Sequence, residues 1–279
     1  MGHMEAEANV RAAVVGCGYV GKAVARSWQQ QGLSVTATTT TPGRIEELQA
    51  VADRVMVVQG CDPEALQSCL AERQVALLSV GAKRGVNYAD TYLGTAKTVA
   101  EILPNTSVQQ LIYTSTSSVY GQQQGATVTE ATAVNPVTDN GKVIAEAEQL
   151  LLGLPQAVCV LRLGGIYGPG RTLAKIYGRA AGQTRPGKGE QATNWVHLSD
   201  IVGAIDFARE HRLSGIYNVV QDEVPTVRDL IAEVYDRNGL EPVKWDPTQP
   251  SSRAYNARVS NAKLKAAGYG FVHPRFFMD

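Results

Sequence analysis

The chain has 279 residues, 44% of them hydrophobic, and its 26 basic and 26 acidic side chains give a formal net charge of zero. This composition supports a sizeable core and excludes a strong electrostatic attraction to nucleic acid or to an anionic membrane. No apolar run approaches the length of a membrane span, and no secretory signal is recognisable. The length fits one large α/β domain or a domain and a half.

The cysteines and histidines are scattered along the chain. No C-x-x-C pair occurs, and no grouping of His, Cys, Asp or Glu has the spacing of metal ligands. We therefore expect reduced thiols in a cytoplasmic protein without a metal. Independently of the cysteines, we expect a small-molecule substrate and a monomer or a homodimer. The four cysteines are Cys17, Cys61, Cys69 and Cys159.

The segment from residue 11 to 31 predicts a strand, a tight glycine turn and a helix. A short β-branched run is followed by Gly16, Gly18 and Gly21 in G-x-G-x-x-G spacing. Gly16 allows the turn, Gly18 lets a pyrophosphate approach the backbone, and Gly21 lets the helix pack on the strand. The amino end of the helix then faces the phosphates. Apolar residues recur four apart along the helix, at Val20, Val24 and Trp28.

The second predicted strand, residues 34–39, ends where this type of fold selects its cofactor. NAD-binding proteins usually place a carboxylate there, whereas NADP-binding proteins supply a cation for the 2′-phosphate. The segment from Thr38 to Arg44 contains no carboxylate, the next one being Glu46, and hydroxyls with a guanidinium suit a phosphate. The segment predicts NADP, with NAD also possible, held by Thr39, Thr40 and Arg44. Alternatively, the threonines cap the helix predicted at 44–51 and Arg44 is only solvated.

Further strands are predicted at 54–58, 75–80, 110–114 and 157–163. Three helices alternate with them: one begins at Pro63, one covers 88–103 and one covers 140–152. Residues 122–137 are expected to form a polar loop. This alternation predicts a Rossmann-type α/β fold, a doubly wound parallel sheet covered on both faces. Asp62 either contacts the adenine edge or caps its helix. Gly81, after the fourth strand, allows a cofactor to lie close.

Beyond residue 171 the alternation is less regular. We expect a loop at 183–194, a strand at 195–198, a helix capped by Ser199 or Asp200, a strand at 216–220 and helices at 226–238 and within 260–271. These pieces predict a small substrate lobe at the carboxyl ends of the strands. The expected division is an NAD(P)-binding core at 10–171 and, at 172–279, a mixed substrate lobe with returning core elements that is not an independent domain.

Several segments resemble one family. VVGCGYVG, IYTSTSSVYG, VLRLGGIYGPGR and NWVHLSDIVGAI are similar to motifs of the extended short-chain dehydrogenase/reductases, the NAD(P)-dependent epimerase/dehydratase group. The resemblance runs from about residue 12 to 270. The GCGYVG pattern departs from the more usual T-G-x-x-G-x-x-G and resembles the atypical, nucleoside-diphosphate-sugar epimerase-like branch.

The resemblance implies catalysis by a Ser or Thr, a Tyr and a Lys. The hydroxyl falls on Thr116. In register with the family motif, however, Asn140 stands at the Tyr position and Ile144 at the Lys position. An amide cannot transfer a proton near pH 7, and Lys142 is two residues from the Tyr position, on nearly the opposite side of a helix.

Three interpretations stay open. Another acid replaces the Tyr, with Tyr120 and Tyr167 the first candidates and Tyr88, His197 and Lys83 the others. Alternatively, the protein binds NADP as a sensor or scaffold without hydride transfer. In the third, the reaction needs no phenol acid, as in the reduction of a carbon–carbon double bond or an imine.

The remaining expected contacts come from the glycine turn, from the end of the fifth strand and from the resemblance. Tyr19, Val20 and Thr114 are expected at the cofactor. Guanidinium groups suit phosphates and carboxylates, and the resemblance places such ligands near two arginines of this chain, Arg171 and Arg253. Alternatively, both arginines are only solvated at the surface. The residues expected at the substrate are Ser115, Asn140, Arg171 and Arg253.

Overall fold

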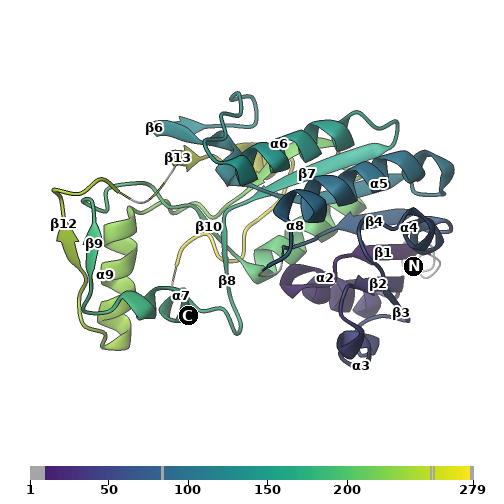
Figure 1. The fold of residues 1–279 in the computed structure, drawn as a ribbon, viewed down its shortest axis with the longest axis horizontal. Helices are drawn as coiled ribbons and strands as arrows, with labels where there is room; N and C mark the ends of the chain where they lie inside the picture. Colours follow the sequence, from purple (N-terminus) through teal and green to yellow (C-terminus); the bar gives the residue numbers. More distant parts are fainter. Residues whose placement is uncertain (1–9, 83–84, 252, 254, 277–279) are drawn as a thin grey trace. The chain divides into compact units, whose positions relative to one another are not determined.

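A computed structural model describes residues 10–82, 85–251, 253 and 255–276 of the chain (Figure 1). Its contacts form two compact units that interleave along the sequence. Among the described residues, unit 1 comprises those from 10 to 115 together with 142–162 and 202–217, and unit 2 comprises those from 116 to 141, from 163 to 201 and from 218 to 276. The expected core at 10–171 and substrate lobe at 172–279 stay predictions.

Unit 1 is built around a seven-stranded sheet, which confirms the predicted Rossmann-type fold. The strand order is β11-β7-β5-β4-β1-β2-β3. The pairs formed by β1, β2, β3, β4 and β5 are parallel. The strands are β1 (Arg11–Val15), β2 (Ser34–Thr39), β3 (Arg54–Val57), β4 (Val75–Leu78), β5 (Gln110–Thr116), β7 (Ala157–Leu163) and β11 (Gly215–Val219), which ends in unit 2.

Helices pack on both faces of this sheet. One face forms an apolar core with α4 (Pro63–Leu70), α5 (Thr95–Ile102) and α6 (Asp139–Leu152). Away from this core, α2 (Tyr19–Gln30) is joined to α8 (Leu198–Glu210), because Trp28 Nε1 donates to Asp206 Oδ1 at 2.7 Å. Shorter turns are α3 (Ile45–Gln49), the 3-10 turns Pro42–Arg44 and Leu103–Asn105, and the π-helical turn Asp90–Gly94.

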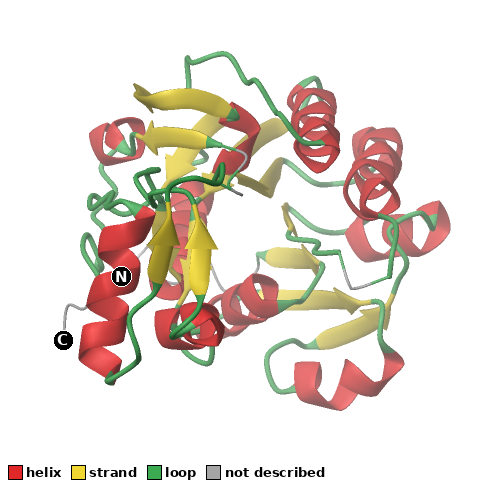
Figure 2. Cartoon of the chain, turned by 60° about the vertical axis from the view of Figure 1, so that its left-hand side comes forward, coloured by secondary structure: helices red, strands yellow, loops and turns green. Residues whose placement is uncertain are grey.

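Unit 2 contains three two-stranded parallel sheets, β8 with β10, β9 with β12, and β6 with β13. The α9 helix (Val227–Asn238) lies beside β9 and β12 in both views (Figure 1 and Figure 2). The strands are β6 (Gln122–Val128), β8 (Gly165–Tyr167), β9 (Thr184–Pro186), β10 (Trp195–His197), β12 (Lys244–Asp246) and β13 (Asn256–Val259). The other helical segments are α7 (Leu173–Tyr177), α10 (Ala262–Ala266) and the 3-10 turns Ser117–Tyr120 and Gly178–Ala180.

Three expectations for unit 2 were wrong. The expected loop at 122–137 contains β6, whose partner β13 lies more than a hundred residues later. The expected loop at 183–194 contains β9. The α8 helix begins at Leu198, so Asp200 lies within its first turn and its carboxylate accepts the backbone N–H groups of Val272 and His273.

None of the helices in the described ranges is long and apolar enough to cross a membrane.

Candidate cofactor and substrate sites

The three glycines of the first turn have the geometry that their predicted tasks require. Gly16 has φ +90°, in the left-handed region, and a Cβ there would lie 2.6 Å from the Ser79 carbonyl oxygen. A Cβ on Gly21 would collide with the Gly16 carbonyl oxygen. At Gly18, in contrast, a Cβ would meet no atom within 4 Å. The turn is therefore closed at its two ends and open in the middle, where a pyrophosphate would approach.

The glycine turn is fastened to the end of β2. The Gly16 N–H donates to Thr38 Oγ1 at 3.0 Å, and the Cys17 N–H donates to the Thr38 carbonyl at 2.9 Å. No side chain among the described residues caps the amino end of α2, and the first turn of this helix holds no acidic residue. Burial raises the pKa of the Cys17 thiol to about 12, so Cys17 is a neutral packing residue in this turn. The helix end thus presents its dipole to an anion, and no acidic side chain of its own first turn competes for it.

Beside this turn lies a cluster of three charges, Lys22, Arg44 and Glu47. Arg44 Nη1 donates to the Cys17 carbonyl at 2.9 Å, and Arg44 Nε donates to Glu47 Oε2 at 3.0 Å. Lys22 Nζ donates to Glu47 Oε1 at 2.5 Å. These two hydrogen-bonded cations lower the pKa of Glu47 to about 2. Arg44 therefore contacts the glycine turn, where a residue for the 2′-phosphate is expected, and it is also paired with the Glu47 carboxylate.

The other residues expected at the cofactor occupy different settings. Asp62 accepts from the Ala65 N–H at 3.0 Å, which confirms that it caps α4. Thr39 is buried and accepts from the Thr41 N–H, whereas Thr40 is exposed. Gly81 is exposed, Tyr19 is 39% exposed, Val20 is buried, and Thr114 donates to Ser79 Oγ at 3.1 Å. Their contacts with a cofactor stay predictions.

The residues that replace the family's Tyr and Lys differ in exposure. Asn140 is exposed in the first turn of α6, whereas Ile144 on the same helix is 2% exposed. A buried isoleucine at the Lys position offers no charge to a ribose or to a phenol. Thr116 Oγ1 accepts from the Ser118 N–H at 3.2 Å, and so caps the 3-10 turn that follows β5.

Tyr120 and Tyr167, the first candidates for a substitute acid, both donate hydrogen bonds within the protein. Tyr120 is completely buried, and its hydroxyl donates to Asn218 Oδ1 at 2.8 Å. Tyr167 is half-buried, and its hydroxyl donates to Gln221 Oε1 at 3.1 Å. Burial raises the pKa of the Tyr167 phenol, and the carboxylate of Asp200 raises it further. Tyr167 thus keeps its proton at neutral pH and is the more accessible of the two.

Of the other candidate acids, Tyr88 packs on Tyr92, with the ring centroids 4.4 Å apart. Burial and the neighbouring Tyr92 raise the pKa of Tyr88 to about 12. Lys83 lies outside the described residues.

Ser115 belongs to a buried charged cluster in unit 1. Its hydroxyl donates to Glu148 Oε1, and Arg162 holds the same carboxylate through Nη2 at 2.6 Å and Nε at 3.1 Å. The side chains of Arg162 and Glu148 are only 4% and 3% exposed. No motif in the sequence indicates this contact of Ser115, and its expected contact with a substrate stays a prediction.

The two arginines expected at the substrate are placed differently. Arg171 is exposed and its Nε donates to the Ile166 carbonyl at 2.9 Å. The Arg253 guanidinium lies 4.5 Å from the centre of the Tyr255 ring, with Nη1 3.4 Å from Thr193 Oγ1. Its Nε is buried and has no hydrogen-bond acceptor among the described residues. Within the described part of the chain, Arg253 is therefore a cation with one buried donor that no acceptor uses.

Sequence reasoning missed a group of side chains that His197 joins in unit 2. Asp200, which is fully buried, accepts from His273 Nδ1 at 3.1 Å. Ser199 Oγ lies 2.8 Å from His197 Nδ1, and the two imidazole rings are 3.9 Å apart. One ligand atom from each of His197, Asp200 and His273 lies within 4.8 Å of the others, close enough for a metal ion. The protein's own hydrogen bonds explain the group, because they anchor the segment at 269–273 to α8.

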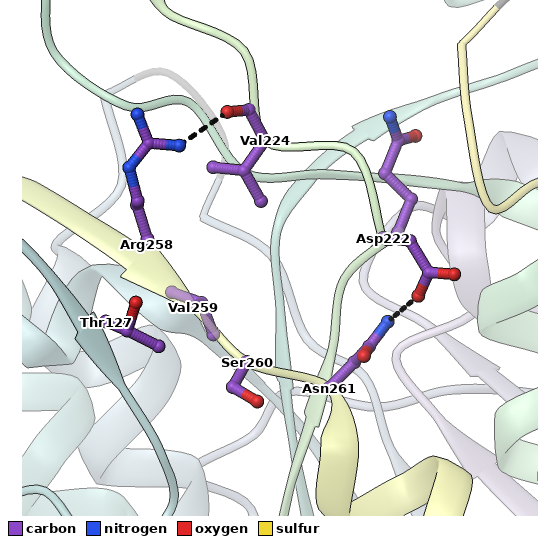
Figure 3. Close-up of a pocket in the computed structure, with 8 residues that line it drawn as sticks. Thr127, Asp222, Val224, Arg258, Val259, Ser260 and Asn261 are labelled. Atoms are coloured by element: carbon purple, nitrogen blue, oxygen red, sulfur yellow. Dashed lines mark hydrogen bonds between the residues drawn. The ribbon is translucent and has the colours of Figure 1, made fainter.

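Unit 2 also holds a polar pocket of about 350 Å³ that contains none of the predicted site residues (Figure 3). Arg258 Nη1 donates to the Val224 carbonyl at 2.9 Å on one side, and Asn261 Nδ2 donates to Asp222 at 2.8 Å on the other. Burial would raise the pKa of Asp222, but hydrogen bonds from Asn261 and Lys265 outweigh it and lower that pKa. Arg258, Asp222 and Asn261 at this pocket are thus already engaged in hydrogen bonds within the protein.

The doubly wound sheet and its open glycine turn define a dinucleotide-binding protein of the Rossmann type. Residues 12–219 match the model of the NAD dependent epimerase/dehydratase family, and the chain belongs to this family. It is 32% identical over 242 residues to "Protein YeeZ" of Escherichia coli K12, which covers 84% of this chain and 86% of YeeZ.

Two further relatives extend the comparison. The "3-diazoavenalumate denitrifying reductase" of a Streptomyces species is 29% identical over 274 residues, covering 90% of this chain and 88% of that protein. A solved structure of a functionally unknown conserved protein from Silicibacter pomeroyi superposes with a TM-score of 0.78 at 26% identity, covering 95% of each chain. The predicted family and fold are thereby confirmed.

Proposed function

We propose that this chain is an NADP-dependent oxidoreductase that also accepts NAD and acts on a small, anionic metabolite. The observation that carries the cofactor assignment is the glycine turn, which is open only at Gly18 and has the Arg44 guanidinium 2.9 Å from the Cys17 carbonyl. A pyrophosphate would bind the amino end of α2, and the guanidinium would bind a 2′-phosphate.

Arg253 supports an anionic substrate. A buried donor without an acceptor is costly unless a ligand supplies one. Among the described residues, the Nε of Arg253 is such a donor, and a guanidinium suits a carboxylate or a phosphate. Its position over Tyr255 holds the plane of the guanidinium in place.

A reduction that needs no dedicated phenol acid agrees best with the side chains. Asn140 cannot supply a proton, Ile144 cannot lower the pKa of a phenol, and Tyr120 is completely buried on Asn218. Thr116 would orient the substrate, and water or the substrate itself would supply the proton. The similarity to a protein named as a denitrifying reductase supports this class of reaction. If a phenol does act, Tyr167 is the candidate, because it is protonated and only half-buried.

The test is consumption of NADPH, followed by its absorbance, with carbonyl, enone, imine, diazo and sugar-nucleotide compounds that carry a carboxylate or phosphate. We expect turnover with at least one class, and Arg253→Gln should raise KM more than it lowers kcat. Arg44→Leu should weaken NADP binding much more than NAD binding.

The second candidate is a sensor or scaffold that binds NADP without turnover. The lost Tyr and Lys positions favour it. Tight nucleotide binding with no consumption across the whole panel would select this function. Absence of binding to either nucleotide in calorimetry would contradict both candidates.

A further inference from the structure

The Arg44 guanidinium, which we assign to the 2′-phosphate, is already hydrogen-bonded to Glu47. A phosphate binds a guanidinium best through two parallel N–H groups. In Arg44 one such edge, Nε with Nη2, already faces Glu47, at 3.0 Å and 3.4 Å. Nη1 is used by the Cys17 carbonyl. Arg44 therefore cannot offer the edge at Nε and Nη2 to a phosphate while Glu47 holds it.

Glu47 also occupies the second cation of the cluster, since Lys22 Nζ lies 2.5 Å from its Oε1. The three charges sum to a single positive charge, whereas the two cations alone would present two. All three side chains are partly exposed, at 32% for Lys22, 30% for Arg44 and 43% for Glu47. Exposed ion pairs of this kind contribute little to stability, so Glu47 can leave the cations at small cost.

We propose that Glu47 gives this chain dual nucleotide specificity, by standing in for the 2′-phosphate when that group is absent. This inference rests on the proposed cofactor function. With NADP, the phosphate displaces the Glu47 carboxylate from Arg44 and Lys22. With NAD, the carboxylate stays and accepts hydrogen bonds from the ribose hydroxyls, the task of the acidic residue in NAD-binding sheets.

The position of Glu47 in the chain explains why a sequence motif misses it. The residue lies in α3, eight positions after the last residue of β2, and reaches the turn only because the chain folds back through the 3-10 turn Pro42–Arg44. Its neighbour Glu46 provides a matched control. Glu46 is an exposed carboxylate on the same helix and has no ion pair within the described part of the chain.

The experiment measures dissociation constants for NADP and NAD by titration calorimetry on the wild type, Glu47→Gln and Glu46→Gln. Removing a negative charge next to the phosphate should tighten NADP binding roughly 3- to 10-fold. The same change should weaken NAD binding about 3-fold, because an amide oxygen is a poorer acceptor than a carboxylate. Glu46→Gln should leave the ratio of the two constants within about 2-fold of the wild type.

Different results overturn different parts. If the wild type binds NADP and Glu47→Gln leaves both constants unchanged, or shifts them no more than Glu46→Gln does, the role of Glu47 is refuted while the cofactor assignment stands. If Glu47→Gln weakens NADP binding, Glu47 positions Arg44 and does not compete with the phosphate. If the wild type binds neither nucleotide, the cofactor assignment and this inference fail together. Circular dichroism on each variant confirms that the fold is retained.

Discussion

Unit 1 contains two carboxylates that are each held by an arginine and one further donor, but only one of them is buried. Glu148, with Arg162 and Ser115, is 3% exposed, whereas Glu47, with Arg44 and Lys22, is 43% exposed. Water cannot replace a partner that the buried Glu148 loses, whereas it readily replaces a partner that the exposed Glu47 loses. The buried cluster is therefore a fixed part of the fold, and the exposed one can exchange its carboxylate for a ligand.

The largest effect should come from breaking the buried cluster. Arg162→Ala leaves the Glu148 carboxylate in a protein interior without its ion-pair partner, which should cost about 3–5 kcal/mol of unfolding free energy. Urea unfolding followed by circular dichroism measures this loss. A destabilisation below about 1 kcal/mol would be typical of an exposed pair and would remove the contrast between the two clusters.

A smaller effect, still on unit 1, separates folding from binding at the glycine turn. Gly16→Ala forces a Cβ to 2.6 Å from a backbone oxygen at φ +90°, so we expect a loss of about 1–3 kcal/mol. Gly18→Ala meets no atom within 4 Å and should leave the unfolding midpoint unchanged while weakening nucleotide binding. Calorimetry and urea unfolding on both variants test this. Equal effects of the two substitutions on stability would contradict the assignment of Gly18 to the cofactor.

These two predictions show what the sequence could and could not establish. The task of Gly21 was predictable, because the atom that its Cβ would meet, the Gly16 carbonyl oxygen, belongs to the same strand–turn–helix unit. The left-handed turn at Gly16 was also predictable from the motif, but its close neighbour Ser79 follows β4 and was not. The partners of Ser115 were not, because Glu148 and Arg162 come from α6 and β7 and no short motif links them to β5. Capping by Asp62 was also predictable, because the N–H group that its carboxylate accepts belongs to Ala65, three residues along the chain.

Pairing between distant segments accounts for the other misses. β6 begins with three glutamines, which carry no apolar alternation, and it is a strand because it pairs with β13. His273 joins His197 and Asp200 from the last residues of the described chain. Glu47 lies close in sequence to the predicted site, but its contact with Lys22 depends on how α3 folds back towards α2.

The smallest expected effect is the dependence of the exposed cluster on pH. The pKa of Glu47 is lowered from 4.5 to about 2 by hydrogen bonds from Arg44 and Lys22. A carboxylate whose pKa is lower in the folded state stabilises that state above its unfolded pKa, and this contribution is lost as the pH falls towards the folded pKa. The stabilisation from Glu47 should therefore be constant from pH 8 to about 5 and should decrease between about 4.5 and 2.

Urea midpoints of the wild type and Glu47→Gln at pH 7, 4.5 and 3.5 measure this decrease, with Glu46→Gln as the control. Other carboxylates titrate in the same range, so only the difference between wild type and variant reports on Glu47. Added salt at pH 7 should reduce that difference, because the pair is exposed and its charges are screened. A difference that ignored salt would place Glu47 with Glu148 as a fixed structural residue, and its exchange with a 2′-phosphate would no longer be expected. A difference that grew on acidification would contradict the lowered pKa of Glu47.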